Sequence, residues 1–122
     1  MNRRILIPIE NQEGTMIAAH FGRSPFFVVY ELDVENRIQA RTVHENAGSH
    51  QGGRGHAHNN VMKLNPTTVI VNGMGPRGIG SFQEAGVAVL KANSNNPRAL
   101  VDAYLAGQLS ELTEGCADAH HK

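Results

Sequence analysis

The chain has 122 residues, of which 40% are hydrophobic and 18% are charged. This length predicts one domain with a single core, and the composition is that of a folded chain rather than a disordered one. Eleven basic residues balance eleven acidic ones, so no net charge favours nucleic acid or an anionic membrane as a partner.

We expect no targeting or membrane signal at the start of the chain. Its apolar run, Ile5–Ile7, ends at Pro8 and is far shorter than a signal-peptide core or a membrane span. We therefore expect a cytoplasmic protein. The single cysteine, Cys116, cannot form an internal disulfide, which leaves a free thiol, a ligand or an intermolecular partner.

Three strands are predicted in the first part of the chain. Arg4–Ile9 is a short apolar run rich in β-branched residues, which is typical of a buried strand. Phe26–Leu32 is a second apolar run, and Arg37–His44 alternates between apolar and polar residues. The polar segment Asp33–Arg37 is typical of a hairpin turn, so we expect the second and third strands to be antiparallel neighbours.

After the three predicted strands comes a glycine-rich segment, and the rest of the chain is predicted to alternate between helices and strands. Gly48–Gly55 holds four glycines in eight residues and predicts a long mobile loop. Proline at a first helical turn, glycine after a last turn and asparagine as a cap mark the helix boundaries beyond it. The predicted elements are a helix through Val61, Met62 and Leu64 that stops near Asn65, a strand over Thr67–Val71, a helix from Pro76 to Gly86, a strand over Val87–Leu90, and a helix from Pro97, capped by Asn96, to Gly107.

The order β-β-β-α-β-α-β-α predicts an α/β fold, a mixed five-stranded sheet flanked by helices, because right-handed crossovers make the last two strands parallel to the first. The order resembles the ribonuclease H topology. We expect residues 1–110 to form this domain and residues 111–122 to form a flexible tail. Two-metal nuclease chemistry needs convergent carboxylates, but the fourth strand ends in Asn72-Gly73 without an acid, so we do not expect hydrolase activity.

Histidines and the cysteine lie outside the segments predicted to form regular core, with His44 and the next three histidines assigned to the glycine-rich loop. Imidazole and thiolate donors suit zinc, copper, iron and metal–sulfur species. The spacing in the loop and tail is flexible rather than that of a zinc finger, so solvated or frayed residues are the alternative. The candidate metal ligands are His20, His50, His56, His58, Cys116, His120 and His121.

His20 is the sharpest single candidate, because it precedes Phe21-Gly22 at a turn from which a neutral imidazole could project. The alternative is a histidine whose ring bonds the backbone to hold that turn. A second motif, Gly73-Met74-Gly75-Pro76-Arg77-Gly78, matches the G-x-G-x-x-G dinucleotide pattern. The next strand offers no acidic residue for a ribose, which favours a tight strand-to-helix turn. The free N–H groups of that turn could hold an anion, with Arg77 as a further contact.

The residues also carry a resemblance to a known family. The quoted blocks are His20-Phe21-Gly22-Arg23-Ser24-x-x-Phe27-x-x-Tyr30, Asn72-Gly73-Met74-Gly75-Pro76-Arg77, Ala85-Gly86-Val87 and Ala103-Tyr104-Leu105-x-Gly107-x-Leu109. In order and spacing they resemble the dinitrogenase iron–molybdenum cofactor biosynthesis family, which includes NifX, NafY and the C-terminal part of NifB. The resemblance implies a ribonuclease H-like fold without nuclease activity, and binding or carriage of a metal–sulfur cofactor or its precursor.

The resemblance implies roles for a few residues only. It makes His20 a candidate cluster ligand, and the C-terminal Cys116, His120 and His121 are similar to the cysteine and histidines of stand-alone members. Ala18 and Ala19 depart from the family, whose members often place an acid or another polar residue there. One cysteine cannot supply the four thiolates of an ordinary iron–sulfur site, which favours a carrier of a preformed cluster.

The sequence therefore predicts a non-enzymatic carrier of a metal–sulfur cofactor containing molybdenum, iron or both. In this hypothesis His20 binds the cofactor, Gly73, Gly75 and Arg77 contact it, and Gly48–Gly55 closes over it. The partners would be proteins that donate and accept the cofactor, and the chain would be a monomer or a weak homodimer. The alternatives are a buffer or sensor of zinc or another divalent metal that uses the loop and tail histidines, and a nucleotide-binding regulatory module.

Overall fold

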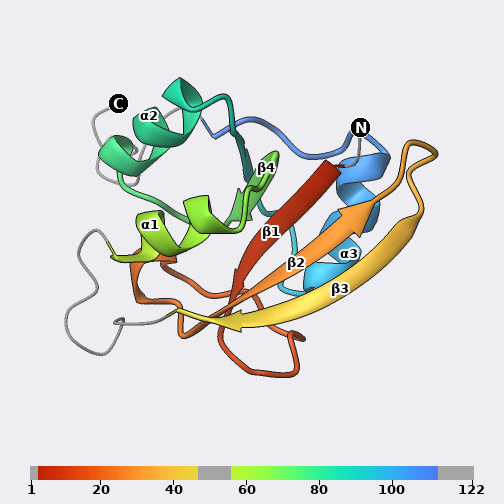
Figure 1. The fold of residues 1–122 in the computed structure, drawn as a ribbon, viewed down its shortest axis with the longest axis horizontal. Helices are drawn as coiled ribbons and strands as arrows, with labels where there is room; N and C mark the ends of the chain where they lie inside the picture. Colours follow the sequence, from red (N-terminus) through yellow and green to blue (C-terminus); the bar gives the residue numbers. More distant parts are fainter. Residues whose placement is uncertain (1–2, 47–55, 113–122) are drawn as a thin grey trace.

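The computed structural model describes residues 3–46 and 56–112, except for the side chains of residues 56–59. A five-stranded sheet in the order β3-β2-β1-β4-β5 forms its centre. Helices α1 and α2 lie on one face of the sheet and α3 lies on the other (Figure 1). The elements are, in chain order, β1 (Arg3–Ile9), the 3-10 turn η1 (Phe21–Arg23), β2 (Phe26–Leu32), β3 (Ile38–Glu45), α1 (His56–Lys63), β4 (Thr68–Val71), α2 (Pro76–Glu84), β5 (Ala88–Lys91) and α3 (Pro97–Leu105).

The sheet is mixed, as predicted. β2 pairs antiparallel with both β1 and β3, while β1, β4 and β5 are parallel. Ile9, Val71 and Lys91 therefore end their strands at one edge of the sheet, which we call the carboxyl edge. β2 starts and β3 ends there too, because Phe26 pairs with both Ile9 and Glu45. The opposite end, where β1, β4 and β5 begin, is the amino edge.

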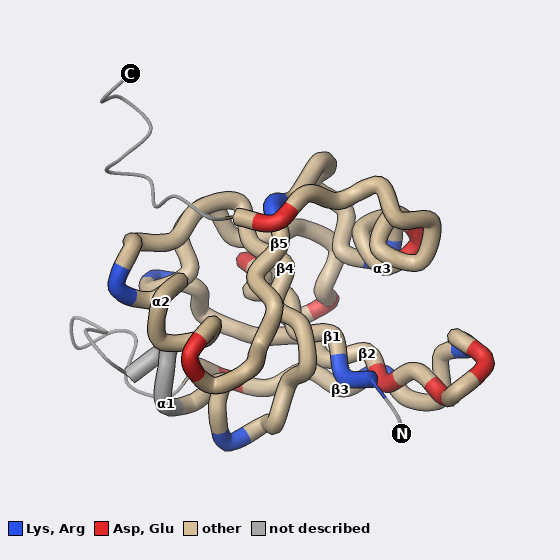
Figure 2. The backbone as a smooth tube through the Cα atoms, turned by 90° about the horizontal axis from the view of Figure 1, so that it is seen from above, with Lys and Arg blue, Asp and Glu red and all other residues tan. Residues whose placement is uncertain are grey.

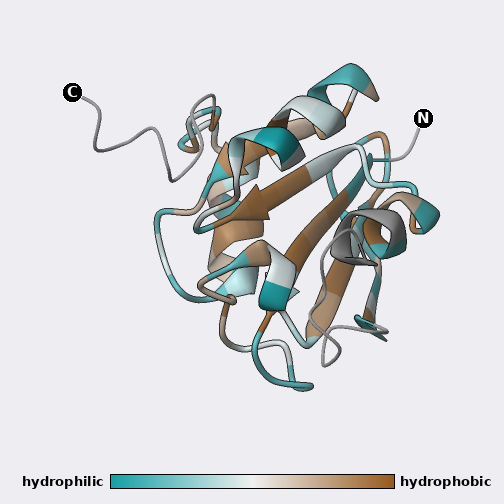
Figure 3. Ribbon diagram, turned by 90° about the vertical axis from the view of Figure 1, so that its left-hand side faces the viewer, coloured by the Kyte–Doolittle hydropathy of each residue, from teal (hydrophilic) through white to brown (hydrophobic). Residues whose placement is uncertain are grey.

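The core consists of two apolar layers, one on each face of the sheet. Ile5, Leu6, Ile7 and Ile9 of the central strand are fully buried, which explains why β1 reads as a continuous apolar run rather than an alternating one. Phe82 of α2 packs in the first layer and Leu100 of α3 in the second. Figure 3 shows the hydrophobic strands enclosed by helices whose outer surfaces are more hydrophilic.

The predicted boundaries of α2 and α3 are confirmed to within two residues. α2 and α3 end where Gly86 and Gly107 adopt positive φ angles of 81° and 71°, a conformation that favours glycine. The next residue in each case bonds back to the last turn, as in Val87 N to Phe82 O at 2.8 Å. At the start of α3, the Asn96 side chain accepts a hydrogen bond from Ala99 N.

Assigning His44, His56 and His58 to the glycine-rich loop was wrong. His44 lies in β3, where its ring is 2.9 Å from the Thr42 hydroxyl, and His56 and His58 lie in α1. The loop prediction failed because apolar residues do not begin until Val61, whereas the helix starts five residues earlier. The loop Gly48–Gly55, which includes His50, lies outside the described residues.

The segment after α3 returns to the sheet. Lys91 N bonds to Ser110 O and Leu112 N bonds to Val89 O, both at 2.8 Å, so residues 110–112 run beside β5. Leu112, which the sequence assigned to a flexible tail, is therefore hydrogen-bonded to the domain, and Glu111 lies opposite Leu90 in an antiparallel bridge. Cys116, His120 and His121 lie outside the described residues. Among the helices of the described part of the chain, none has the length and apolar character to cross a membrane.

Candidate functional site at the carboxyl edge

His20 is presented at the carboxyl edge by a buried aromatic anchor. It precedes η1 in an extended conformation and is exposed, while the next residue, Phe21, is buried. The Phe21 ring lies 6.0 Å from the Phe27 ring and meets the Phe82 ring edge to face at 5.7 Å. Because the anchor is packed between strand and helix, the position of His20 is coupled to the core.

The loop that leads to His20 is also fixed to the sheet. Ala18 N bonds to Pro8 O and Ile17 N bonds to Asn95 O, both at 2.9 Å. The side chains of Ile17 and Ala18 are buried, whereas Met16 and Ala19 are exposed, so only the middle of the apolar segment before His20 belongs to the core. The backbone just before the His20 turn is therefore fixed by hydrogen bonds.

The glycine motif lies directly beside this turn. Phe21 N donates to Gly73 O at 3.4 Å, which joins the two sequence motifs across the carboxyl edge. Gly75 caps α2 without a side chain, and Arg77 is exposed in the first helical turn. A Cβ atom on Gly75 would meet no atom within 4 Å, so the space beside this residue is open.

The last glycine of the motif has a packing role instead. A Cβ atom on Gly78 would lie 3.0 Å from Cγ and Sδ of Met74, closer than ordinary contact. Met74 is itself buried against the core. Gly78 is therefore explained by packing in the strand-to-helix turn that the sequence favoured over a nucleotide site. Gly22 in the histidine turn, in contrast, has open space beside it, as Gly75 has.

A buried polar network below His20 was not predicted. The Ser24 hydroxyl lies 3.1 Å from Ile9 O and 2.5 Å from Phe26 O, and its single proton can be donated to either carbonyl. Asn46 Nδ2 donates to Ser24 O at 2.7 Å, and Asn60 Nδ2 of α1 donates to Asn46 Oδ1 at 2.6 Å. Ser24 and Asn46 are almost fully buried. The network ties the histidine turn to β1, β3 and α1.

The candidate ligands are only partly brought together. The structure places His20 beside Gly73 and the start of α2, and it places α1, which carries His56 and His58, against η1. Positions two residues apart in a helix do not lie side by side on its surface. Among the described side chains, no three or more histidine, cysteine or acidic groups are arranged to hold a metal ion.

This arrangement fits a ligand that brings most of its own donors. One exposed imidazole can fill one coordination position, and the open space at Gly22 and Gly75 lets a bulky group approach the backbone. A bare divalent cation needs several converging protein ligands. Charged positions are scattered along the chain with long neutral stretches between them (Figure 2).

The chain matches a known protein family over most of its length. Residues 3–107 match the family described as "Dinitrogenase iron-molybdenum cofactor". The chain belongs to this family. Its members are associated with the biosynthesis or binding of the iron–molybdenum cofactor and not clearly with catalysis. Membership therefore suggests that this chain takes part in the biosynthesis or binding of that cofactor.

The chain is also similar to individual proteins over most of its length. The uncharacterized protein MJ0580 of Methanocaldococcus jannaschii is 27% identical over 112 residues, which are 89% of this chain and 91% of that protein. The crystal structure of PH0822 is 26% identical, with a TM-score of 0.75 over 89% of this chain and 96% of its own. The apo form of the orange protein from Desulfovibrio gigas, at 23% identity, has the same fold, with a TM-score of 0.78 over 93% and 95% of the two chains.

Proposed function

We propose that this protein is a non-enzymatic carrier of a preformed metal–sulfur cofactor that contains molybdenum, iron or both. The observation that supports this most directly is the pairing of an exposed His20 with the glycine turn Gly73–Gly75, which is joined to the histidine turn by one backbone hydrogen bond and has open space at Gly75. Family membership supplies the class of cofactor. The fold that presents the site is, in this proposal, of the ribonuclease H type.

The donor set favours transport over assembly. A scaffold that builds an iron–sulfur cluster needs several thiolates, and this chain has one cysteine, Cys116. A cluster with its own sulfides needs only one or two protein ligands, and weak ligation lets a carrier release its cargo to an acceptor protein. We assign the first ligand to His20, with Gly73, Gly75 and Arg77 as contacts.

The surroundings of His20 suit exchange of a ligand. Its side chain is exposed, while Phe21 and the buried network through Ser24 hold the backbone on which it sits. A fixed backbone reduces the ordering cost of binding, and an exposed imidazole leaves the cargo accessible to a donor or acceptor protein. The proposal places the protein in the cytoplasm as a monomer or weak homodimer.

The test is an anaerobic titration of untagged protein with isolated iron–molybdenum cofactor and, separately, with tetrathiomolybdate, followed by visible absorption. We expect saturable binding by the wild type and a loss of at least about tenfold in affinity, or ~1.4 kcal/mol, for His20→Ala. Binding should also weaken as the pH falls, because a protonated imidazole cannot coordinate a metal.

The matched control is His44→Ala, since His44 lies in β3 and its ring contacts the Thr42 hydroxyl rather than the turn. This variant should bind like the wild type. Equal binding by His20→Ala and wild type, with thermal unfolding unchanged, would remove His20 from the proposal. Elemental analysis of protein purified anaerobically would then show whether zinc, the cargo of a simple metal buffer, is bound instead.

A further inference from the structure

Lys91, the last residue of β5, reaches across to the neighbouring strand at the carboxyl edge. Its Nζ donates to the carbonyl oxygen of Asn72 at 2.6 Å. Asn72 is the first residue after β4, and the next carbonyl, that of Gly73, accepts the hydrogen bond from Phe21 N. Lys91 and the turn that carries His20 therefore bond to two consecutive carbonyl groups: Lys91 to that of Asn72, and Phe21 N to that of Gly73.

The position of Lys91 in the sheet has a separate significance. β4 and β5 are parallel neighbours, and the helices that follow them leave toward opposite faces, α2 to one and α3 to the other (Figure 1). In open α/β sheets, ligands bind in the crevice outside the carboxyl ends of the parallel strands. Lys91 and Asn72 lie at the carboxyl ends of β5 and β4.

The charge at this position is not neutralised within the described part of the chain. The ion pairs found there involve Arg4, Arg37 and Arg98, and none involves Lys91. Arg23 in η1 and Arg77 at the start of α2 likewise have no carboxylate partner among the described residues. An ammonium group has three donors, and one of them is used on Asn72.

We propose that Lys91 is a further binding residue of the His20 site and that it selects a multiply negative metal–sulfur species over a bare divalent cation. This inference rests on the proposed function and narrows it to a class of cargo. The ammonium group attracts an anion and repels a cation that approaches the same edge, and both effects are strong at short range. The remaining donors of Lys91 would bind the sulfides of the cargo.

The experiment compares Lys91→Gln and Lys91→Arg with the wild type by anaerobic titration with two probes. Tetrathiomolybdate is a tetrahedral dianion with metal–sulfur bonds, and Zn²⁺ is a bare cation. The matched control is Lys63→Gln, which removes the same charge from the end of α1, where Lys63 is exposed and precedes the amino-edge start of β4.

We expect Lys91→Gln to bind tetrathiomolybdate about tenfold more weakly, the size of one lost charge-assisted hydrogen bond. Lys91→Arg should keep most of the affinity, Lys63→Gln should match the wild type, and zinc binding should not weaken in any of them. Equal effects of Lys91→Gln and Lys63→Gln would overturn the inference. Equal weakening for both probes would also overturn it. Loss of the hydrogen bond from Lys91 to Asn72 O would then weaken binding by disturbing the turn after β4, not by removing a contact with the anion.

The outcomes separate this inference from the proposed function. If His20→Ala loses tetrathiomolybdate and Lys91→Gln keeps it, Lys91 has no part in binding and the carrier proposal stands. If the wild type binds neither tetrathiomolybdate nor the isolated cofactor, both proposals fail.

Discussion

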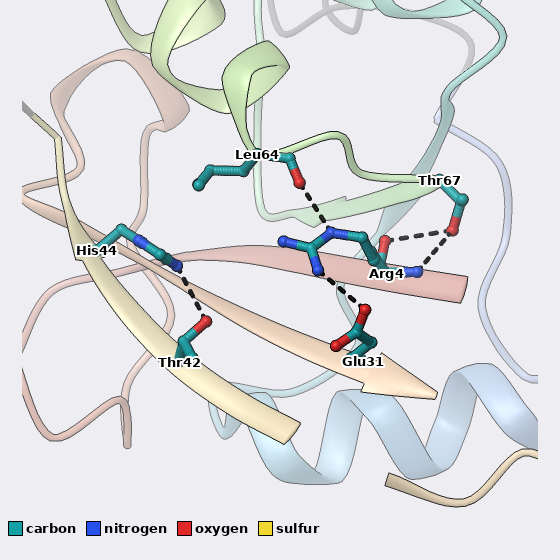
Figure 4. Close-up of polar contacts among 6 residues, drawn as sticks. All are labelled: Arg4, Glu31, Thr42, His44, Leu64 and Thr67. Carbon is teal, nitrogen blue, oxygen red and sulfur yellow. Dashed lines mark hydrogen bonds and ion pairs between the residues drawn. The ribbon is translucent and has the colours of Figure 1, made fainter. Parts of the chain in front are cut away.

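Arg4 and Arg37, which lie toward the amino edge of the sheet, form ion pairs, whereas at the carboxyl edge Arg23, Arg77 and Lys91 form no ion pair among the described residues. Arg4 shows the first pattern: its guanidinium contacts Glu31 at 3.1 Å and Leu64 O at 2.8 Å, and its backbone N–H bonds to the Thr67 hydroxyl (Figure 4). The comparison teaches that the charge of Arg4 is neutralised within the fold, while the charges of Arg23, Arg77 and Lys91 are not neutralised by a described carboxylate.

The carboxyl edge has its own rigid support, but this support lies below the surface. Ser24, Asn46 and Asn60 bond one another through buried or half-buried groups, and Phe21 packs between Phe27 and Phe82. The exposed residues above them have few partners. The proposed binding residues therefore extend from a rigid backbone, which is the arrangement that limits the entropy lost on binding.

Removing the buried hydrogen bonds of Asn46 should have the largest effect on stability. Asn46→Ala removes the donor to Ser24 O and the acceptor for Asn60 Nδ2, so buried polar groups lose a partner. We expect the free energy of unfolding to fall by about 2 kcal/mol. Tetrathiomolybdate binding should weaken as well, because Ser24 ends the turn that carries His20. Urea unfolding and anaerobic titration measure the two effects.

The control for this variant is Asn93→Ala, an exposed asparagine in the loop after β5 at the same edge. Its unfolding free energy should stay within about 0.5 kcal/mol of the wild type. A similar value for Asn46→Ala would mean that the network does not support the turn.

Removing the contacts of Arg4 at the amino edge should lower the free energy of unfolding by a smaller amount and leave ligand binding unchanged. Arg4→Met keeps the apolar stem but loses the contacts with Glu31 and Leu64 O, and both Arg4 and Glu31 are about 30% exposed. We expect a loss of about 1 kcal/mol in unfolding free energy, since half-exposed ion pairs contribute little. Titration with tetrathiomolybdate should give the wild-type affinity. Weaker binding in this variant would show that the two edges are coupled.

The sequence allowed the elements to be predicted because their boundaries are local. Pro76 and Pro97 open helices, and Gly86 and Gly107 end them through backbone angles that glycine prefers. The start of α1 was missed because no apolar residue or proline marks it. His56 and His58 were therefore assigned to a loop.

The site could be predicted only where one segment supplies it. His20 and the glycine motif were found from their own residues, but the hydrogen bond that joins them spans Phe21 to Gly73. Asn46 contacts residues 22 and 14 positions away, and Lys91 meets Asn72 only because β4 and β5 are neighbours. Such contacts depend on tertiary packing, which periodicity and caps do not encode.

The smallest expected effect concerns pH at the amino edge, where the β2–β3 hairpin holds Asp33. The pKa of Asp33 falls from its ordinary 3.8 to about 2, mainly because the Arg37 backbone N–H donates to its carboxylate. Gln39 Nε2 and the Glu35 N–H add further hydrogen bonds at 2.8 Å. Two-dimensional NMR of the side-chain carboxyl would measure this value directly.

The sign of the resulting pH dependence follows from proton uptake. Because the pKa of Asp33 is lower in the folded state, the unfolded chain binds more protons as the pH falls below about 4. Asp33 therefore stabilises the fold fully above that range, and its contribution is lost as the pH falls through about 2. Asp33→Asn keeps an acceptor oxygen for the turn but cannot titrate, so its unfolding free energy should fall less steeply with acid than that of the wild type. Parallel curves would mean that the hairpin carboxylate, although well bonded in the folded state, keeps equivalent partners after unfolding.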